Sequence, residues 1–595
     1  MEHLSPDARY LLEIAAMGGA DTDHALLKTL FDQSMRTDFE ASLSELVNAH
    51  YLEVSEGEPA RIRSTSELVR QTVASTLPSA ERARIHADMV ESLVARPTGQ
   101  HPELTLEIAR HAVQGVDRLG NDRVAGYCLA AAEILASQFD WAGIVDVLRS
   151  GLSLIGPETP PKLKADLHAA YGMALVRSRD TFVEVEAVQS IGQAMDYYIH
   201  AGSPDRALQV AQFPFAAVPG RIEAIKLLEK GLELAAGDPL ATAGLLNRLS
   251  VFASISEGDS EKATALSDRA LAMAEESGDQ SMVAVVLSGR TRLESSMFES
   301  EKAIETATRA LEIASVHSID STASFNAHLS AAHAAMFLGR TDDATHLMNA
   351  AVRATRASGD IQRQVGALWL GIRLTMDRGD FDTATDLSEQ AFAVAPRSTG
   401  VLALRAWIEY ERSNPASGGE FLEQLHSIEA VSRSNAVFGL TPWDLKCQVL
   451  GYVYQITGDH SMLTEAEAVA AGRAAGPDGN LFQQFTGFNA VAALAAISGD
   501  RFRAAALLAE YERVAAQYDV PDLFALAIAG LHRTLGDTRK ATDFYERALE
   551  YNRKSEFALM SAYASFDFTG MLIDIGDAKT LTRARNVLHT AIGLA

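Results

Sequence analysis

Nine side chains suited to binding stand at fixed distances before a set of recurring glycines. Six residues before the glycine stand Phe252, His333, Arg373 and Tyr452, and Arg292 has the equivalent position in a repeat that lacks the glycine. Ten residues before the glycine stand Arg248, Trp369, Gln448 and Asn489. Aromatic rings offer contact area, and guanidinium groups offer paired hydrogen bonds to carboxylates or phosphates. These residue types predict recognition of a ligand.

Residue patterns typical of catalysis are absent from the sequence. Cys128 and Cys447 form no CxxC pair, and the 16 histidines include no HExxH. Neither GxSxG nor GxGxxG occurs, which removes the usual nucleophile and dinucleotide motifs. Acidic pairs such as Glu275-Glu276 are expected on solvated helix faces. We therefore expect no enzyme activity, no metal site and no cofactor.

The charge balance disfavours nucleic acid as a partner. The chain carries 78 acidic and 52 basic side chains, a formal net charge of -26, and no run of Lys and Arg that would neutralise phosphates. The first five residues lack the pattern of a signal peptide, and no uncharged stretch reaches the length of a membrane span. These features predict a cytoplasmic protein with no nucleic acid or membrane contact of its own.

The recurring glycines define a repeat of about 40 residues. They are Gly258, Gly339, Gly379, Gly458, Gly499, Gly536 and Gly576, spaced by about 40 or 80 residues, with skipped turns expected near Phe298 and Gly418-Gly419. Alanine usually follows five residues later, and a second small residue comes seven further on, as in Ala263 and Ala270. Seven residues are two helical turns, so both alanines lie on one face and let a neighbouring helix approach closely.

The segments that carry this pattern resemble the tetratricopeptide repeat, whose second helix has such an alanine pair. Clear examples run from Ala263 to Ala274, from Ala303 to Ala314 and from Ala541 to Leu549. A single hairpin cannot bury its apolar face alone, so consecutive hairpins stack. We expect an all-α fold: a right-handed α-solenoid of about ten 40-residue hairpins, with an accessible inner groove lined by the nine side chains.

The first part of the chain predicts a different small domain. Helices are expected over residues 4–17, from Thr22 or Asp23 to residue 30, and over 38–52, followed by strands at 52–54 and 61–63. Three helices and a two-stranded wing make a winged helix. Its third helix carries three carboxylates and no Lys or Arg, so we expect protein packing rather than DNA contact. The expected domains are a winged helix at 1–95, a helical connector at 96–160 and a superhelix at 161–595.

This order of parts resembles the C-terminal portion of STAND-class regulators of the LuxR family, of which MalT is the type example. The stretches that carry the resemblance are Leu4 to Leu12, Thr65 to Val73, Leu77 to His86 and Ala125 to Glu133. Ser64 and Ser66 stand where that family commonly has an aromatic residue and a histidine. The sequence has no GxxxxGK[ST] loop and no C-terminal helix-turn-helix, so it is expected to be part of a longer protein.

The resemblance implies a sensor region that binds a protein or small-molecule inducer in its superhelix groove. The ATPase and DNA-binding parts would then lie outside this chain. Two alternatives stay open: a free-standing adaptor scaffold, and the C-terminal regulatory part of a nucleotide cyclase. Self-association into a homo-oligomer is a further partner state that the sequence leaves open.

Overall fold

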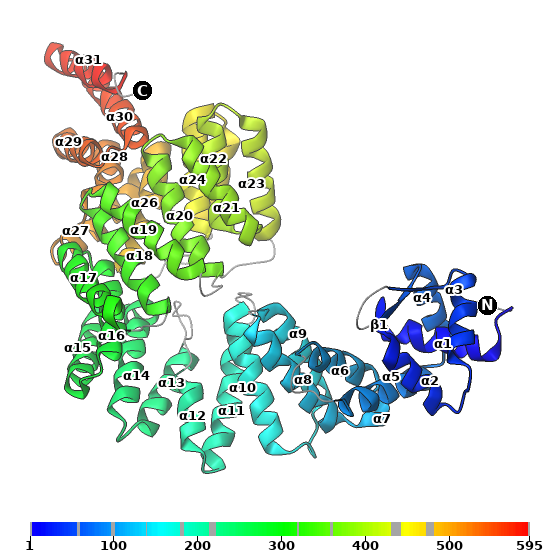
Figure 1. The fold of residues 1–595 in the computed structure, drawn as a ribbon. Helices are drawn as coiled ribbons and strands as arrows, with labels where there is room; N and C mark the ends of the chain where they lie inside the picture. Colours follow the sequence, from blue (N-terminus) through cyan, green and yellow to red (C-terminus); the bar gives the residue numbers. More distant parts are fainter. Residues whose placement is uncertain are drawn as a thin grey trace. The chain divides into compact units, whose positions relative to one another are not determined.

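The chain folds into two compact units, Met1–Val210 and Ala211–Ala595, in a computed structural model. The structure describes residues 3–55, 60–96, 102–138, 140–178, 184–212, 222–317, 321–356, 361–429, 442–471 and 481–592. Nearly all secondary structure in these residues is helical, apart from one small sheet near the N-terminus (Figure 1). The predicted class, a solenoid of helix hairpins, is confirmed. The domain boundaries at 95 and 160 stay predictions.

The first unit opens with three capped helices. Ser5, Asp23 and Asp38 each accept a hydrogen bond from a backbone N–H in the first turn of the helix that follows, which satisfies one of its unpaired donors. The helices are α1 (Pro6–Gly18), α2 (His24–Gln33) and α3 (Phe39–Asn48). Their apolar faces meet in one core around Leu11 and Phe31, both fully buried.

A three-stranded antiparallel sheet packs beside these helices. It consists of β1 (Asp21–Asp23), β2 (Leu52–Val54) and β3 (Arg61–Ser64), in the order β1-β3-β2. The β2–β3 pair agrees with the expected hairpin. Strand β1 was not predicted, because the three residues of Asp-Thr-Asp are too short to show an alternating pattern. Thr22 pairs with Ile62, and both side chains are buried.

The rest of the first unit is helical. The helices are α4 (Glu67–Thr76), α5 (Ser79–Val94), α6 (Pro102–Gln114), α7 (Val116–Leu119), α8 (Asn121–Ser137), α9 (Trp141–Leu154), α10 (Pro161–Ser178), α11 (Glu184–His200) and α12 (Pro204–Ala211). Helix α8 packs on α9 and α10 on α11, so helix pairing begins before residue 160.

The second unit is a series of hairpins, each a first helix followed by its partner. Its first helices are α14 (Pro239–Phe252, continued by a π-helical turn, η1, Ala253–Glu257), α16 (Gln280–Ser296), α18 (Ser321–Phe337), α20 (Ile361–Asp377), α22 (Thr399–Glu411), α24 (Pro442–Thr457), α26 (Leu481–Ser498), α28 (Ala525–Leu535, preceded by a short 3-10 turn, η2, Asp522–Phe524) and α30 (Ala558–Ile575). Their partners are α15 (Ser260–Ser277), α17 (Ser300–Val316), α19 (Thr341–Arg356), α21 (Phe381–Val394), α23 (Pro415–Glu429), α25 (His460–Ala471), α27 (Arg501–Ala515), α29 (Thr538–Lys554) and α31 (Ala578–Ile592), with α13 (Ile222–Leu234) ahead of the series.

The recurring glycines end the first helices, as predicted. All seven have positive φ, a conformation that glycine adopts without a steric penalty. In the Gly-Asp turns the aspartate then caps the partner helix: Asp500 Oδ1 accepts from the Arg503 backbone N–H at 3.0 Å, and Asp537 Oδ1 from that of Lys540 at 3.1 Å. The dipeptide therefore ends one helix and starts the next.

The two skipped turns differ in outcome. Phe298 has a φ of 63° between α16 and α17, so the turn expected there is confirmed. The turn expected near Gly418-Gly419 is wrong, since both glycines lie inside α23. The left-handed residue is Ser413, and the Asn414 side chain donates to Glu409 at 2.9 Å. Gly418 instead allows close packing, because a Cβ there would lie 2.7 Å from the Tyr410 ring.

The repeated alanines lie where helices touch. Each is at most 2% exposed: Ala263, Ala270, Ala303, Ala310, Ala344, Ala351, Ala384, Ala391, Ala504, Ala541 and Ala548. Consecutive first helices also contact one another from α14 to α18 and from α20 to α30. They therefore form an inner layer of the second unit.

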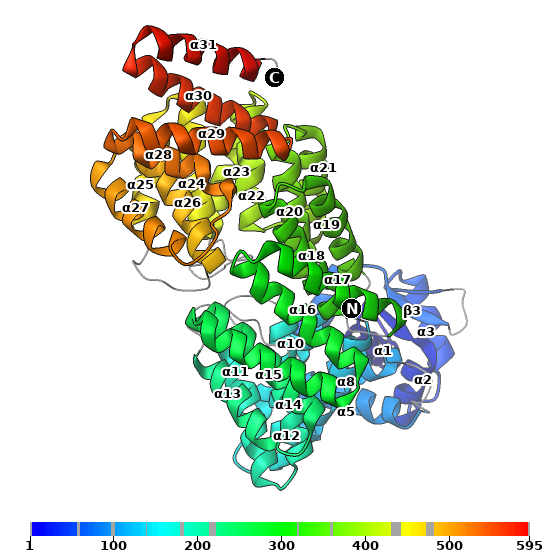
Figure 2. The same ribbon diagram turned by 90° about the vertical axis from the view of Figure 1, so that its left-hand side faces the viewer.

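The last hairpins of the second unit return to much earlier ones. The Tyr551 hydroxyl donates to the Met336 carbonyl at 2.5 Å, and the Thr341 hydroxyl to the Ser555 carbonyl at 2.8 Å. Helix α30 also contacts α20, which precedes it by more than 150 residues (Figure 2). Because of these contacts, part of the inner face that was expected to form a groove is also lined by residues of α29 and α30.

Candidate functional site

Residues of the inner layer and of the last hairpins line a cavity of about 490 Å³. This volume is in the range of sites that hold small ligands. Six of the nine predicted binding residues line it: His333, Trp369, Arg373, Gln448, Tyr452 and Asn489. They come from α18, α20, α24 and α26, where they occupy equivalent positions of the repeat. Their role in binding stays a prediction.

The other three predicted residues do not line this cavity. Arg248 and Phe252 belong to α14, and Arg292 belongs to α16, both before the hairpins that α29 and α30 contact. Phe252 is 2% exposed and packs between helices. Burial and the nearby charge of Arg363 lower the pKa of Arg292 to about 10. The register is the same in these hairpins, but the enclosing contacts begin later in the chain.

An ion pair on α20 forms one polar wall. Arg373 Nε donates to Asp377 Oδ2 at 2.8 Å, and the two residues are one helical turn apart. The Arg373 guanidinium lies over the Trp407 ring at 5.2 Å and reaches the Met560 sulfur at 3.9 Å. Asp377 is 1% exposed, and burial raises its pKa although the charge of Arg373 lowers it.

Aromatic rings form the adjoining wall. Tyr452 stacks on Trp407 with ring centroids 4.3 Å apart, and Tyr563 lies 4.7 Å from Tyr452. Glu411 Oε1 accepts from Trp407 Nε1 at 2.8 Å and from the Tyr563 hydroxyl at 2.5 Å. Burial raises the pKa of Tyr452 to about 12, so its phenol stays protonated at neutral pH.

The C-terminal hairpins supply lining residues that were not predicted from the sequence. Among them are Arg533 on α28, Asn552 on α29, and Tyr563 and Asp567 on α30. Arg533 donates to the Asp567 carbonyl at 2.9 Å and to the Asp574 carboxylate at 2.8 Å. Burial raises the pKa of the Asp567 carboxyl to about 6. No local signal points to these positions, since they reach the cavity only through contacts distant in sequence.

The histidine in this lining is suited to a neutral role. His333 is buried, and its Nδ1 lies 3.0 Å from the Leu329 carbonyl. Burial, then the charge of Arg292, lowers its pKa to about 4. At neutral pH the ring is therefore uncharged. In the parts of the chain that the structure describes, no cluster of His, Cys, Asp and Glu could hold a metal ion. The cavity lining thus combines polar, charged and aromatic side chains.

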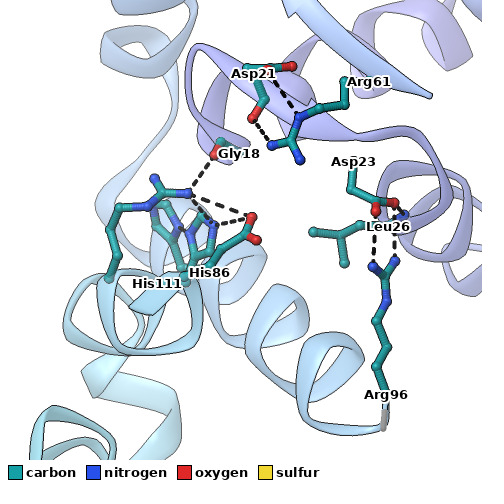
Figure 3. A network of polar contacts seen from close by, with 10 residues as sticks. Gly18, Asp21, Asp23, Leu26, Arg61, His86, Arg96 and His111 are labelled. Carbon is teal, nitrogen blue, oxygen red and sulfur yellow. Dashed lines mark hydrogen bonds and ion pairs between the residues drawn. The ribbon is translucent and has the colours of Figure 1, made fainter. Parts of the chain in front are cut away.

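A second polar network lies in the first unit (Figure 3). The ring nitrogens His86 Nδ1 and His111 Nδ1 are 2.9 Å apart, and His111 Nε2 is 2.8 Å from Arg110 Nη2. Arg110 also donates to the Gly18 carbonyl at 2.7 Å. The network therefore joins α5, α6 and the end of α1. His86 and His111 are at most 9% exposed, so they serve structure rather than a surface site.

Two carboxylates of β1 complete this region of the first unit. Asp21 binds Arg61 at 3.0 Å, and Asp23 binds Arg96 at 3.2 Å (Figure 3). Ser64 and Ser66 lie close by, where the Ser64 hydroxyl donates to the Ser66 carbonyl at 3.1 Å.

Throughout the residues that the structure places, no helix combines the length and the apolar character needed to cross a bilayer.

Comparison with known proteins identifies one repeat. The family model described as tetratricopeptide repeat matches residues 525–555, which cover α28 and α29. No curated protein matches this chain.

Three solved structures share low identity with the chain. A STAND protein with a tetratricopeptide repeat sensor from Pyrococcus horikoshii is 14% identical with a TM-score of 0.30. That match covers 72% of this chain and 64% of the Pyrococcus protein. A Rap protein complexed with competence and sporulation factor is 14% identical with a TM-score of 0.32, covering 59% and 93% of the two chains. A chain of the APC/C hetero-tetramer Cut9–Hcn1 is 12% identical with a TM-score of 0.40, and the match covers 89% of this chain and 92% of that chain. None of these likenesses bears on function at such scores.

Proposed function

We propose that the second unit is a sensor that binds a protein segment or small-molecule inducer in the cavity between its early and late hairpins. One observation carries this proposal: six residues chosen only by their place in the repeat line the same cavity. Neutral, aromatic and charged groups line it together, as in sites that orient a ligand through a few polar contacts.

The position of the cavity gives binding a structural consequence. A ligand that touches both α20 and α30 stabilises the arrangement in which the late hairpins contact the early ones. An inducer present at 100 times its Kd adds about 2.7 kcal/mol to that arrangement. The signal is then the shift toward this arrangement, and its size is set by how much more tightly the inducer binds it than an arrangement in which the late and early hairpins are apart.

We further propose that this sensor belongs to a STAND-class regulator resembling MalT and its LuxR-family relatives. The support is the first unit, where three helices and a β-hairpin precede the helix pairs in the order that the resemblance implies. Nucleotide and DNA binding would then reside in parts of the protein outside this sequence.

A volume-filling substitution tests the sensor proposal. Ala493 on α26 lines the cavity, whereas Ala505 on α27 is exposed. We expect that compounds or short peptides that stabilise the wild-type chain in a thermal-shift screen also stabilise Ala505→Phe, but not Ala493→Phe. A verified ligand that stabilises all three equally binds elsewhere, and an adaptor scaffold would then explain the chain better.

A further inference from the structure

We infer that the cavity selects ligands whose polar end is a protonated amine, held at Asp377. This inference rests on the proposed function of the cavity and names the chemical class of its ligand.

The main observation is an unpaired carboxylate oxygen. Asp377 Oδ2 accepts from Arg373 Nε at 2.8 Å, but Asp377 Oδ1 is buried and has no hydrogen-bond partner among the described residues. The side chain lines the cavity and is 1% exposed. A buried polar atom without a partner is unfavourable by about 1–3 kcal/mol, and more when it is charged. A donor on the ligand would remove this penalty.

A second acceptor in the same lining also lacks a hydrogen-bond partner among the described residues. Gln455 Oε1 on α24 is buried with no hydrogen-bond partner in the part of the chain that the structure describes. Carboxylate and amide oxygens can only accept, so both pair with N–H or O–H groups of a ligand. An ammonium group carries three donors and no acceptor.

The cationic side chains of the lining already have acceptors. Arg533 donates to the Asp567 carbonyl and the Asp574 carboxylate, and Arg373 donates to Asp377. An anionic ligand would therefore compete with acceptors that are already in place. An amine displaces nothing, because Asp377 Oδ1 has no partner to lose.

The aromatic wall fits the remainder of such a ligand. Trp369, Tyr452 and Tyr563 line the cavity, and Tyr452 stacks on Trp407 and lies 4.7 Å from Tyr563. Ring faces attract cations and bury apolar groups. An amine that carries an aromatic or aliphatic group therefore meets both kinds of wall at once.

Three matched probes test this inference on the full chain. They are 2-phenylethylamine, 3-phenylpropionate and 2-phenylethanol, which share the ring and differ in the charge of the polar end. Ligand-observed NMR at pH 7.5 measures their Kd values. We expect the amine to bind more tightly than the other two, and Asp377→Asn to weaken the amine by at least about tenfold, which is the effect of losing a charged hydrogen bond.

Two control variants make the result specific. Asp386→Asn changes an exposed carboxylate on α21 and should leave all three Kd values unchanged. Gln455→Met removes the second acceptor and should weaken the amine less than Asp377→Asn does. Circular dichroism melting confirms that each variant is folded.

Each other outcome overturns the inference in a recognisable way. If the alcohol or the carboxylate binds as tightly as the amine, or more tightly, the cavity is a binding site but does not select amines. Unchanged amine binding in Asp377→Asn removes Asp377 as its partner. Absence of binding by all three probes also removes the amine class, and the Ala493→Phe comparison then decides the proposed function separately.

Discussion

At the scale of single residues, the histidine pair of the first unit is buried between α5 and α6. His86 Nδ1 and His111 Nδ1 are 2.9 Å apart, so one of these nitrogens donates and the other accepts. Arg110 and the carboxylate of Glu107 both lie beside His111 Nε2. Burial lowers the pKa of both histidines, so both rings are neutral at neutral pH.

This arrangement predicts that the first unit loses stability in mild acid. Burial, then the charge of His111, lowers the pKa of His86 to about 4 from an ordinary value of 6.5. Between these values the unfolded chain binds more protons, so the unfolding free energy falls as the pH falls, by roughly 2–3 kcal/mol over the window. We expect hydrogen exchange of α5 and α6, corrected for intrinsic rates, to show less protection at pH 5 than at pH 7.

A substitution separates this effect from other acid effects. In His86→Asn the side chain does not titrate, so the loss of protection between pH 7 and pH 5 should be smaller than in the wild type. His200→Asn changes an exposed histidine on α11 and should keep the wild-type loss. The same pH dependence in His86→Asn and the wild type would contradict the assignment.

At the scale of elements, the turn glycines are not equivalent. Gly339 and Gly499 have φ values of 71° and 68°, so replacement by alanine strains both turns by about 1 kcal/mol. A Cβ at Gly499 meets nothing within 4 Å, whereas one at Gly339 lies 2.9 Å from the Ser555 hydroxyl. Gly339→Ala should lower the thermal midpoint more than Gly499→Ala, by circular dichroism. Equal midpoints would mean that the contact with Ser555 is not tight.

The element scale also shows why much of the fold follows from the sequence. Left-handed glycines and buried alanines are local requirements, so their spacing alone is enough to identify the hairpins. Ser413 shows the limit of this reasoning: a serine at positive φ ends α22, and Gly418 serves packing against Tyr410 instead. The three residues of β1 are too few to show an alternating pattern, and they form a strand only by pairing with β3, about 40 residues further along the chain.

The candidate site could be predicted only in part for a related reason. The repeat register gives the inner face of each first helix, which is enough to select Trp369, Arg373 and Tyr452. It does not give the curvature of the series, which decides that α30 meets α20. Tyr563 and Asp567 therefore reach the cavity without any signal in their own neighbourhood, and the selection of Arg292 adds a residue outside it.

At the scale of the whole second unit, closure depends on a few buried polar contacts. Tyr551→Phe removes the hydroxyl that donates to the Met336 carbonyl at 2.5 Å and leaves that carbonyl without this partner. We expect a loss of about 0.5–1.5 kcal/mol in unfolding free energy, since the Met336 carbonyl still accepts from the Gly339 backbone N–H at 2.9 Å. Weaker binding of any cavity ligand should accompany it. Urea titration followed by circular dichroism measures the first effect, and ligand-observed NMR the second.

Tyr518→Phe is the matched control for that experiment. Tyr518 is half-buried on the same unit, and its hydroxyl makes no hydrogen bond with the described residues. Its replacement should change neither stability nor binding by more than a few tenths of a kcal/mol. Similar losses in both variants would show that the hydroxyl of Tyr551 has no special part in closure.

The bond between Tyr551 and Met336 also constrains the order in which the second unit is made. Hairpins that stack only on their neighbours can fold one after another as they leave the ribosome. Here the hydrogen bond between Tyr551 and the Met336 carbonyl cannot form until more than 200 further residues have been synthesised. The cavity therefore cannot be completed until α30 has been synthesised, and a chain released before that point would expose its aromatic wall to chaperones and proteases.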